Sequence, residues 1–428
     1  MNLLLKNGRL VDPLTGRDET VDLLIQKGLI EKIGARLNGS KGVEERNLGG
    51  ALILPGFIDM HVHLREPGYE YKETIESGTR AAAAGGFTGV CCMPNTNPAI
   101  DDASVVRLIK ERAAGSNGGI VDVHPVAAVT IGRQGKQLTP MMELAESGAV
   151  GFSDDGDPVR DSEVMRRALE YAAMAGKPVI QHAEESTLTR GGAMNEGAVS
   201  TSLGMPAMPA VAEDIMVSRD LQLLSYTGGQ YHLAHVSTGA AVAKIAAGKK
   251  RGLSVTCEVS PHHFTLTDEV VRSFSTNTKM NPPLRSREDV ESMIEGLRDG
   301  TIDAIASDHA PHSYDDKEVE FLQAPFGIVG LETAVGLAFT MLLVPKILNL
   351  VSLIEKFSTN PRRILHLPEV RLAEGEAANL TLIDPEARWT VSVREFKSKS
   401  KNSPFDGWKL QGRAIGVINN DHAFWLAP

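Results

Sequence analysis

Short apolar runs alternate with amphipathic stretches through the middle of the chain. Eight of these runs are mostly rich in β-forming residues, and they cover residues 52–60, 86–93, 121–129, 149–152, 178–181, 231–236, 254–259 and 302–307. The stretches between them carry Ala, Leu and charged residues at helical spacing, and the clearest helical candidates are residues 71–84, 162–175, 210–225 and 351–365. Repeated strand-then-helix units indicate a parallel sheet. Eight such units predict an α/β fold whose sheet closes into a (β/α)8 TIM-type barrel.

The structural alternative is a doubly wound open sheet, which commonly binds a dinucleotide at a glycine-rich turn. The first strand-helix junction has no Gly-x-Gly-x-x-Gly, and Gly85 and Gly86 precede a strand instead of opening a helix. The pattern therefore favours the barrel.

The two ends of the chain have a different texture, in which short apolar runs alternate with turn residues. Asn7-Gly8 and Lys27-Gly28 separate such runs near the start, and Asp384-Pro385 does so near the end. Each end is too short to hold a good core alone. We expect residues 1–54 and 369–428 to form one composite β-sandwich domain, and residues 55–368 to form the catalytic barrel.

Composition and charge narrow the class of protein. The 428 residues are 42% hydrophobic and 23% charged, as in ordinary soluble globular proteins, and no run of about eighteen apolar residues predicts a membrane span. The first residues lack an export signal, so we expect a cytoplasmic protein. The formal net charge is -10 and no Lys/Arg-rich tract has interleaved aromatics, which argues against nucleic acid as a partner. Local cations must therefore hold any anionic substrate.

The chain has three cysteines. Cys91 and Cys92 are adjacent inside an apolar run that reads as a buried strand. We interpret them as reduced core thiols, and not as disulfide partners or zinc ligands.

Two histidines follow the first apolar run. His61 and His63 are separated by one residue, so an extended strand would place both imidazoles on the same side. Such a pair suits one divalent metal, although a hydrogen-bonded pair in a polar loop would have the same spacing. The pair alone leaves both interpretations open.

Other chemically active residues also follow the predicted strands. Active sites of such barrels lie at the C-terminal ends of the strands, and the candidates at these ends are His61, His63, Asp154, Asp155, His182, His235 and Asp308. Imidazole and carboxylate ligands suit zinc, and a shared carboxylate allows two ions about 3.5 to 4 Å apart, which lower the pKa of a bound water toward about 7. Asp308 could hold an ion and also shuttle a proton. His232 should face away, because three residues along a strand reverse the side.

Three further residues could contact a substrate at the same ends. Arg65 carries a planar cation that suits a carboxylate, although such an arginine at a rim is also commonly a salt bridge. Asn95 follows the second strand and Asn281 follows the seventh, but Asn-Pro is also a plain turn signal. The residues alone leave both interpretations open at all three positions.

Six motifs give the chain a specific family resemblance. They are Pro55-Gly56-Phe57-Ile58-Asp59-Met60-His61-Val62-His63-Leu64-Arg65, Met93-Pro94-Asn95-Thr96, Phe152-Ser153-Asp154-Asp155-Gly156, His235-Val236-Ser237-Thr238, Asn281-Pro282-Pro283-Leu284-Arg285 and Ser307-Asp308-His309-Ala310-Pro311-His312. With these motifs the chain resembles the amidohydrolase superfamily and, more closely, dihydroorotases of the long bacterial type, nearly from end to end.

The resemblance implies a zinc enzyme that interconverts N-carbamoyl-L-aspartate and L-dihydroorotate, the ring-closing step of pyrimidine synthesis. It implies one or two zinc ions, with two favoured. The first would be held by His61, His63 and Asp308, and the second by His182 and His235. One residue of the pair Asp154 and Asp155 would bridge them, and the spacing back from His182 favours Asp155.

The resemblance also assigns the substrate contacts. The substrate carboxylate would be gripped by Arg65, Asn95 and His312, with His63 nearby in contact with the substrate. The pyrimidine ring would be addressed by Asn281 and by the backbone of Phe326 and Gly327. Asp308 would take the proton of the ureido nitrogen as the ring closes and return it in the hydrolytic direction.

Two alternatives remain beside this reading. Hydantoinases, dihydropyrimidinases and allantoinases place a carboxylated lysine between their metals, and residues 150–158 contain no lysine. A non-catalytic dihydroorotase-like scaffold subunit of aspartate transcarbamoylase should have lost metal ligands, whereas this chain keeps them. We expect a homodimer that takes a small-molecule substrate and binds neither nucleic acid nor membrane. Association with aspartate transcarbamoylase stays open.

Overall fold

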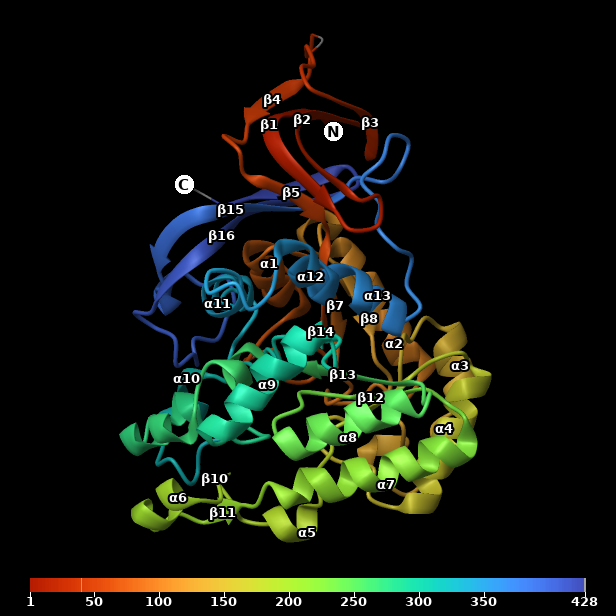
Figure 1. The fold of residues 1–428 in the computed structure, drawn as a ribbon. Coiled ribbons are helices and arrows are strands. Elements are labelled where there is room, and N and C mark those ends of the chain that lie inside the picture. Colours follow the sequence, from red (N-terminus) through yellow and green to blue (C-terminus); the bar gives the residue numbers. More distant parts are fainter. Residues whose placement is uncertain (40, 427–428) are drawn as a thin grey trace.

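A barrel surrounded by helices makes up most of the molecule, and a separate β sheet covers one side of it (Figure 1). The computed structural model describes residues 1–39 and 41–426. In this part of the chain no helix combines the length and the apolar character that crossing a membrane would require.

Parallel strands in the order of the chain form the barrel. The strands are β6 (Phe57–Val62), β7 (Phe87–Cys92), β8 (Asp122–Pro125), β9 (Val179–Gln181), β12 (Tyr231–Leu233), β13 (Val255–Val259) and β14 (Ala304–Ile305). The predicted fourth strand is so short that it appears only as parallel bridges from Phe152 to Ala127 and to Val179. A parallel bridge between Val62 and His309 closes the ring. The eight predicted runs therefore lie side by side in the predicted order, and the predicted barrel is confirmed.

The first predicted run is two strands instead of one. β5 (Leu52–Pro55) belongs to the terminal sheet, where it pairs with β15, and β6 begins the barrel after Gly56. Gly56 donates its backbone N–H to Asn379 O at 2.9 Å, and the Asn379 side chain occupies the space where a Cβ would be. The run is continuous in sequence because both strands are buried, so hydrophobicity alone does not mark the point where the chain leaves one sheet for the other.

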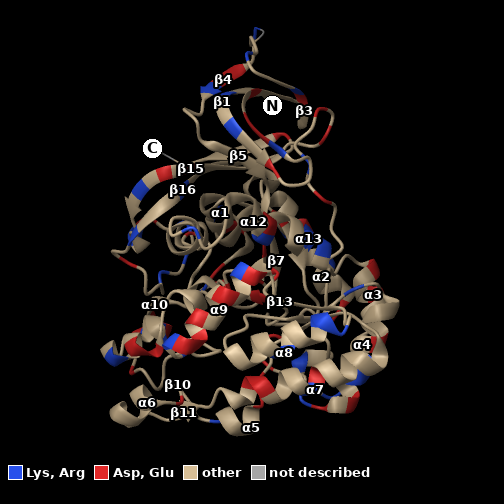
Figure 2. Cartoon of the chain, viewed as in Figure 1, with Lys and Arg blue, Asp and Glu red and all other residues tan. Residues whose placement is uncertain are grey.

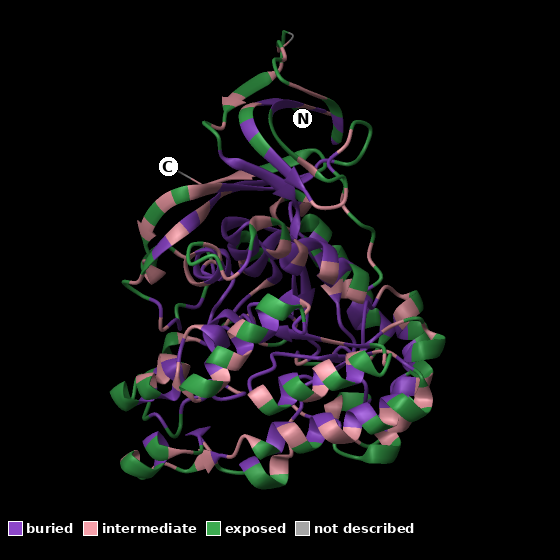
Figure 3. Cartoon of the chain, in the orientation of Figure 1, coloured by how far each residue is buried: buried purple, intermediate pink, exposed green. Residues whose placement is uncertain are grey.

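Helices surround the barrel and cover its strands. They are α1 (Ile75–Gly85), α2 (Ala103–Gly115), α3 (Met141–Glu146), α4 (Ser162–Met174), α5 (Ser186–Thr189), α6 (Ala198–Leu203), α7 (Val211–Thr227), α8 (Gly239–Lys250), α9 (Arg287–Asp299), α10 (Tyr314–Lys317), α11 (Ala334–Ala338), α12 (Leu350–Ile354) and α13 (Asn360–Ile364). The barrel strands are mostly buried, whereas the outer helices alternate buried and exposed residues (Figure 3). Acidic and basic side chains are interspersed along α9, as in Figure 2.

Capping residues explain where the predicted helices begin and end. α1 starts at Ile75, later than predicted, because the Thr74 hydroxyl accepts a hydrogen bond from the backbone N–H of Ser77 and so ends the preceding loop. α7 ends before Gly228, whose φ of 70° suits the left-handed cap that glycine adopts without strain. The last predicted helix, residues 351–365, is α12 and α13 joined by a π-helical segment.

Both ends of the chain build the terminal sheet. Its strands run in the order β17 (His422–Trp425), β16 (Lys409–Asn419), β15 (Asn379–Thr390), β5, β1 (Asn2–Asp12), β2 (Arg17–Gln26) and β3 (Leu29–Gly34), and β4 (Glu44–Asn47) also pairs with β1. A short parallel pair, β10 (Met194–Asn195) and β11 (Ala207–Met208), lies apart from both sheets. Leu5 and Leu23 from the start pack in one apolar core with Leu380 and Ile418 from the end. The predicted composite β unit is therefore confirmed as part of the fold class.

Aromatic side chains pack together where the first two barrel strands begin, close to the terminal sheet. The Phe57 and Phe357 rings stack with centroids 5.2 Å apart, and Phe87 meets Phe357 edge-on at 6.0 Å. All three are buried, and burying one such ring contributes about 1.5 to 3 kcal/mol. Cys91 and Cys92 are buried free thiols, as predicted, and burial raises the pKa of Cys92 to about 12.

Candidate metal centre

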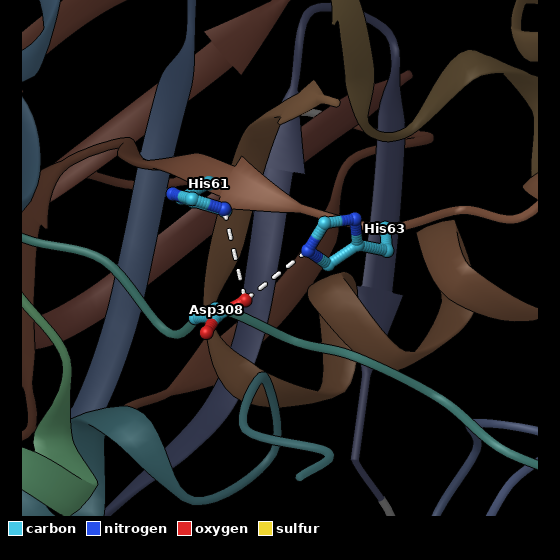
Figure 4. Close-up of side chains that lie close together, drawn as sticks. All are labelled: His61, His63 and Asp308. Atoms are coloured by element: carbon cyan, nitrogen blue, oxygen red, sulfur yellow. Dashed lines mark hydrogen bonds and ion pairs between the residues drawn. The ribbon is translucent and has the colours of Figure 1, made fainter. Parts of the chain in front are cut away.

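His61, His63 and Asp308 meet at the C-terminal end of the barrel strands. His61 lies in β6 and His63 directly follows it, while Asp308 follows β14 on the neighbouring strand of the ring. Asp308 Oδ1 lies 3.2 Å from His63 Nε2 and 3.6 Å from His61 Nε2 (Figure 4). All three side chains are buried. Two imidazole nitrogens and one carboxylate oxygen thus face a common point.

Asp155 lies between this group and a second one. Its Oδ1 is 3.4 Å from His61 Nε2 and 3.4 Å from His235 Nε2, and its Oδ2 is 3.6 Å from His63 Nε2. His182 completes the second group, with Nδ1 3.0 Å from His235 Nε2 and 3.8 Å from Asp155 Oδ1. The ligand atoms of His61, Asp155 and His235 all lie within 4.8 Å of one another.

The two neighbouring aspartates of the fourth strand point to different partners. Asp154 Oδ1 accepts a hydrogen bond from the backbone N–H of Thr130 at 3.0 Å, and the Thr130 hydroxyl donates to Oδ2. Asp154 therefore holds the loop after β8, whereas Asp155 faces the histidines. The geometry favours Asp155 as the shared ligand.

Three buried atoms of the cluster have no hydrogen-bond partner among residues 1–39 and 41–426. They are His61 Nε2, Asp155 Oδ1 and His235 Nδ1. Unpaired polar atoms are costly in a protein interior, and a divalent cation between His61 Nε2 and Asp155 Oδ1 would satisfy those two atoms. The nitrogen and oxygen donor set suits zinc, so the residues present fit the metal that the sequence predicts.

Backbone strain marks three residues of the site. Arg65, His235 and Asp308 adopt φ values of 63°, 30° and 47°, in a region that side chains other than glycine rarely enter. Such conformations persist only where the surroundings enforce them, and they concentrate at functional sites. Each of them turns a polar side chain into the cavity at the strand ends.

Glu258 supports the first group from inside the barrel. His61 Nδ1–H donates to Glu258 Oε1 at 2.8 Å, and His232 Nε2 lies 3.3 Å from Glu258 Oε2. Burial alone would raise the pKa of Glu258, but the neighbouring imidazoles of His232 and His61 lower it to about 2. His232 therefore contacts Glu258 and not the ligand group. Sequence reasoning missed Glu258, although one acidic residue inside an apolar β13 run was a usable signal.

Asp59 ties the first and last strands of the barrel together below the ligands. Its carboxylate accepts hydrogen bonds from the backbone N–H groups of His61 and Ser307, each at 3.1 Å. Burial raises the pKa of Asp59 to about 7. Asp59 thereby fixes the backbone of His61 and of Ser307, the residue before Asp308.

A cavity of about 310 Å³ opens in front of the ligand groups. Every residue that the sequence predicts to contact the substrate lines it, namely His63, Arg65, Asn95, Asn281, His312, Phe326 and Gly327. Arg65 Nε donates to Pro311 O at 3.1 Å, and burial lowers the pKa of Arg65 to about 10, so it stays cationic at neutral pH. The cavity therefore presents one fixed positive charge beside the ligands.

Hydrogen bonds orient the other polar groups of the cavity. His63 Nδ1–H donates to Asn95 Oδ1 at 2.8 Å, and His312 Nε2–H donates to Phe326 O at 2.8 Å. Burial, with Arg65 nearby, lowers the pKa of His312 to about 2, so its ring is neutral. Glu184 accepts hydrogen bonds from His182 and Asn281, which line the cavity. Sequence reasoning did not assign Glu184, although it stands two residues after a predicted ligand.

Comparison with known proteins gives a consistent result. The family model described as Dihydro-orotase-like matches residues 50–241. Proteins named dihydroorotase from Trichlorobacter lovleyi and Syntrophus aciditrophicus are 52% and 51% identical to this chain, each over 98% of both sequences.

Solved structures with the same fold are more distant in sequence. An L-hydantoinase from Arthrobacter aurescens has a TM-score of 0.88 at 24% identity and covers 100% of this chain and 97% of its own. A dihydropyrimidinase from Brevibacillus agri has a TM-score of 0.83 at 21% identity, with coverage of 99% and 95%. At these identities the similarity shows the fold alone.

Proposed function

The chain belongs to the dihydroorotase family, and from this premise we propose that two zinc ions at the barrel mouth serve its reaction. The protein is a cyclic amidohydrolase, a dihydroorotase, which interconverts N-carbamoyl-L-aspartate and L-dihydroorotate in pyrimidine biosynthesis. We propose that the metal is zinc, that two ions bind per chain, and that each site residue has the role given below.

One observation carries the metal assignment, namely that Asp155 stands between two groups of ligands. His61, His63 and Asp308 would hold the first ion, and His182 and His235 the second, with Asp155 shared. When bound, such ions polarise a carbonyl and activate water near neutral pH. The unpaired atoms of His61 and Asp155 support this proposal.

Asp308 is proposed as the group that moves the proton. Its carboxylate is buried at the cavity wall, and burial, which alone would raise its pKa, is outweighed by the nearby imidazoles of His63, His61 and His235, which lower it. An ionised carboxylate can accept the ureido proton as the ring closes and return it to the leaving nitrogen during hydrolysis.

Arg65, the cationic residue of the cavity, is proposed to favour substrates whose ring carries a carboxylate. Arg65 would pair with the substrate carboxylate, with Asn95 and His312 as further contacts and His63 beside them. Asn281 and the backbone of Phe326 and Gly327 would contact the ring. Hydantoins and dihydrouracil lack that carboxylate, so a hydantoinase-like activity would leave Arg65 without a substrate partner.

Three further predictions extend beyond the site. We propose that the protein is a homodimer, is cytoplasmic and can associate with aspartate transcarbamoylase. A non-catalytic scaffold is disfavoured because the ligand atoms converge.

Metal analysis combined with a substrate comparison tests the proposal. Purified protein should contain two zinc ions per chain and hydrolyse dihydroorotate far faster than dihydrouracil. Removal of zinc by a chelator should stop turnover, and added zinc should restore it. Turnover that survives complete chelation, or a preference for dihydrouracil, would overturn the assignment.

A further inference from the structure

Glu184 is not one of the proposed metal ligands, but it contacts both a ligand, His182, and a proposed substrate contact, Asn281. Its Oε2 accepts from His182 Nε2–H at 3.0 Å and from Asn281 Nδ2–H at 2.8 Å. The Thr189 hydroxyl donates to the other carboxylate oxygen, Oε1. The side chain is 15% exposed, and three donors hold its carboxylate in place.

The contact with His182 determines which ring nitrogen can bind a metal. An ionised carboxylate cannot donate, so His182 Nε2 carries the proton and Nδ1 keeps a free electron pair. Nδ1 is the atom that faces His235 and Asp155. His61, His63 and His235 instead turn Nε2 toward the ligand groups. His182 thus needs a partner on Nε2, and Glu184 is that partner.

The contact with Asn281 determines what this side chain offers to a substrate. Because Nδ2 donates to Glu184, Oδ1 is the atom of Asn281 that can accept a hydrogen bond in the cavity. A carbonyl oxygen in that position recognises a ring N–H donor, as found in a cyclic amide or ureide.

We propose that Glu184 is a positioning residue that couples the second metal site to recognition of the substrate ring. The proposal rests on the function given above and deepens it. Glu184 acts through His182 on the ion and through Asn281 on the ring N–H, so the same carboxylate oxygen aligns both groups.

The neighbouring Glu185 provides a matched control. Its carboxylate accepts from the backbone N–H and the hydroxyl of Thr187 and caps α5, away from the ligands. Zinc titration of the metal-free protein against a competing chelator should show that Glu184→Ala weakens the second ion about 10- to 100-fold, while Glu185→Ala binds both ions as the wild type does. Equal zinc affinities in the two variants would overturn the proposal.

Kinetics at saturating zinc test the contact with Asn281. Glu184→Ala and Asn281→Ala should each raise KM for dihydroorotate severalfold, and the double variant should resemble Asn281→Ala, because the group that Glu184 aligns is then absent. Fully additive increases in KM would overturn the coupling.

A second variant covers the case in which Glu184→Ala does not fold. Glu184→Gln keeps an acceptor oxygen but removes the charge, so it should weaken the second ion less than alanine and more than Glu185→Ala. Wild-type zinc affinity in Glu184→Gln would also overturn the proposal. The zinc titration needs no turnover, so it separates failure of this inference from failure of the proposed reaction, which wild-type turnover measures.

Discussion

The two sides of the metal centre are supported at different depths. On the side of β6, His61 is held by Glu258, whose side chain is 1% exposed inside the barrel. On the side of β9, His182 is held by Glu184, which is 15% exposed and lies on the loop after the strand. The first support belongs to the barrel core, and the second lies behind two residues that line the cavity, His182 and Asn281. Metal retention and substrate recognition are therefore separable on the first side but share a carboxylate on the second.

Removing the shared ligand, Asp155, should have the largest effect, because it should weaken zinc binding on both sides of the metal centre. Asp155→Asn should lose zinc from both groups, and turnover should fall to background, because Asp155 lies within reach of His61 and His235 together. Asp154→Asn is the control, since Asp154 bonds Thr130 instead. Zinc content and dihydroorotate hydrolysis measure both effects, and an Asp155→Asn protein that keeps two ions would contradict the shared position.

Changing the proton-transfer residue should affect chemistry on the first side alone. Asp308→Asn should lower kcat by about 10²- to 10⁴-fold, because an amide cannot take up the proton. Asn tolerates the positive φ of this position, so the far-ultraviolet circular dichroism should not change. Retained turnover with normal zinc content would remove Asp308 from proton transfer.

The buried support of the first side should matter for metal affinity and not for substrate choice. Glu258→Gln should weaken the first zinc ion about 10- to 100-fold by making His61 a poorer ligand, as measured by chelator competition. KM at saturating zinc should stay unchanged. Thr256→Val is the control, because it removes only the hydroxyl that contacts His232 Nδ1. A larger zinc loss in Thr256→Val would contradict the role of Glu258.

The smallest effect is expected from replacing Arg65, and it should weaken binding of the carboxylated substrate only. Arg65→Met should raise KM for dihydroorotate about tenfold, as expected for one lost charge-assisted hydrogen bond. Inhibition by an uncharged ring analogue should stay the same. If both ligands weaken equally, Arg65 does not grip the carboxylate.

Sequence patterns predicted the barrel because each strand is a compact apolar run and each candidate ligand follows one. His61, His182 and Asp308 could be found in this way, since strand ends converge in a closed parallel barrel. The orientation of each side chain was harder to predict. Choosing between Asp154 and Asp155 depends on Thr130, which is distant in sequence and holds one of them.

Contacts between side chains on different barrel strands also could not be predicted from sequence patterns. Glu258 and His61 are 197 residues apart, and no local rule pairs an inward-facing acid on one strand with an imidazole on another. The break at Gly56 escaped for a similar reason, because β5 and β6 are both fully buried and read as one run. In each case the missing information was a partner from a distant part of the chain.

The terminal sheet has a consequence for how the protein is made. β5 pairs with β15, and Phe57 N–H donates to the Thr381 hydroxyl across 324 residues of sequence. During translation the first strands must therefore wait, with the β5 edge unpaired, until the ribosome has released the whole barrel. An unpaired edge is open to other chains, so premature termination before β15 yields a product prone to aggregate.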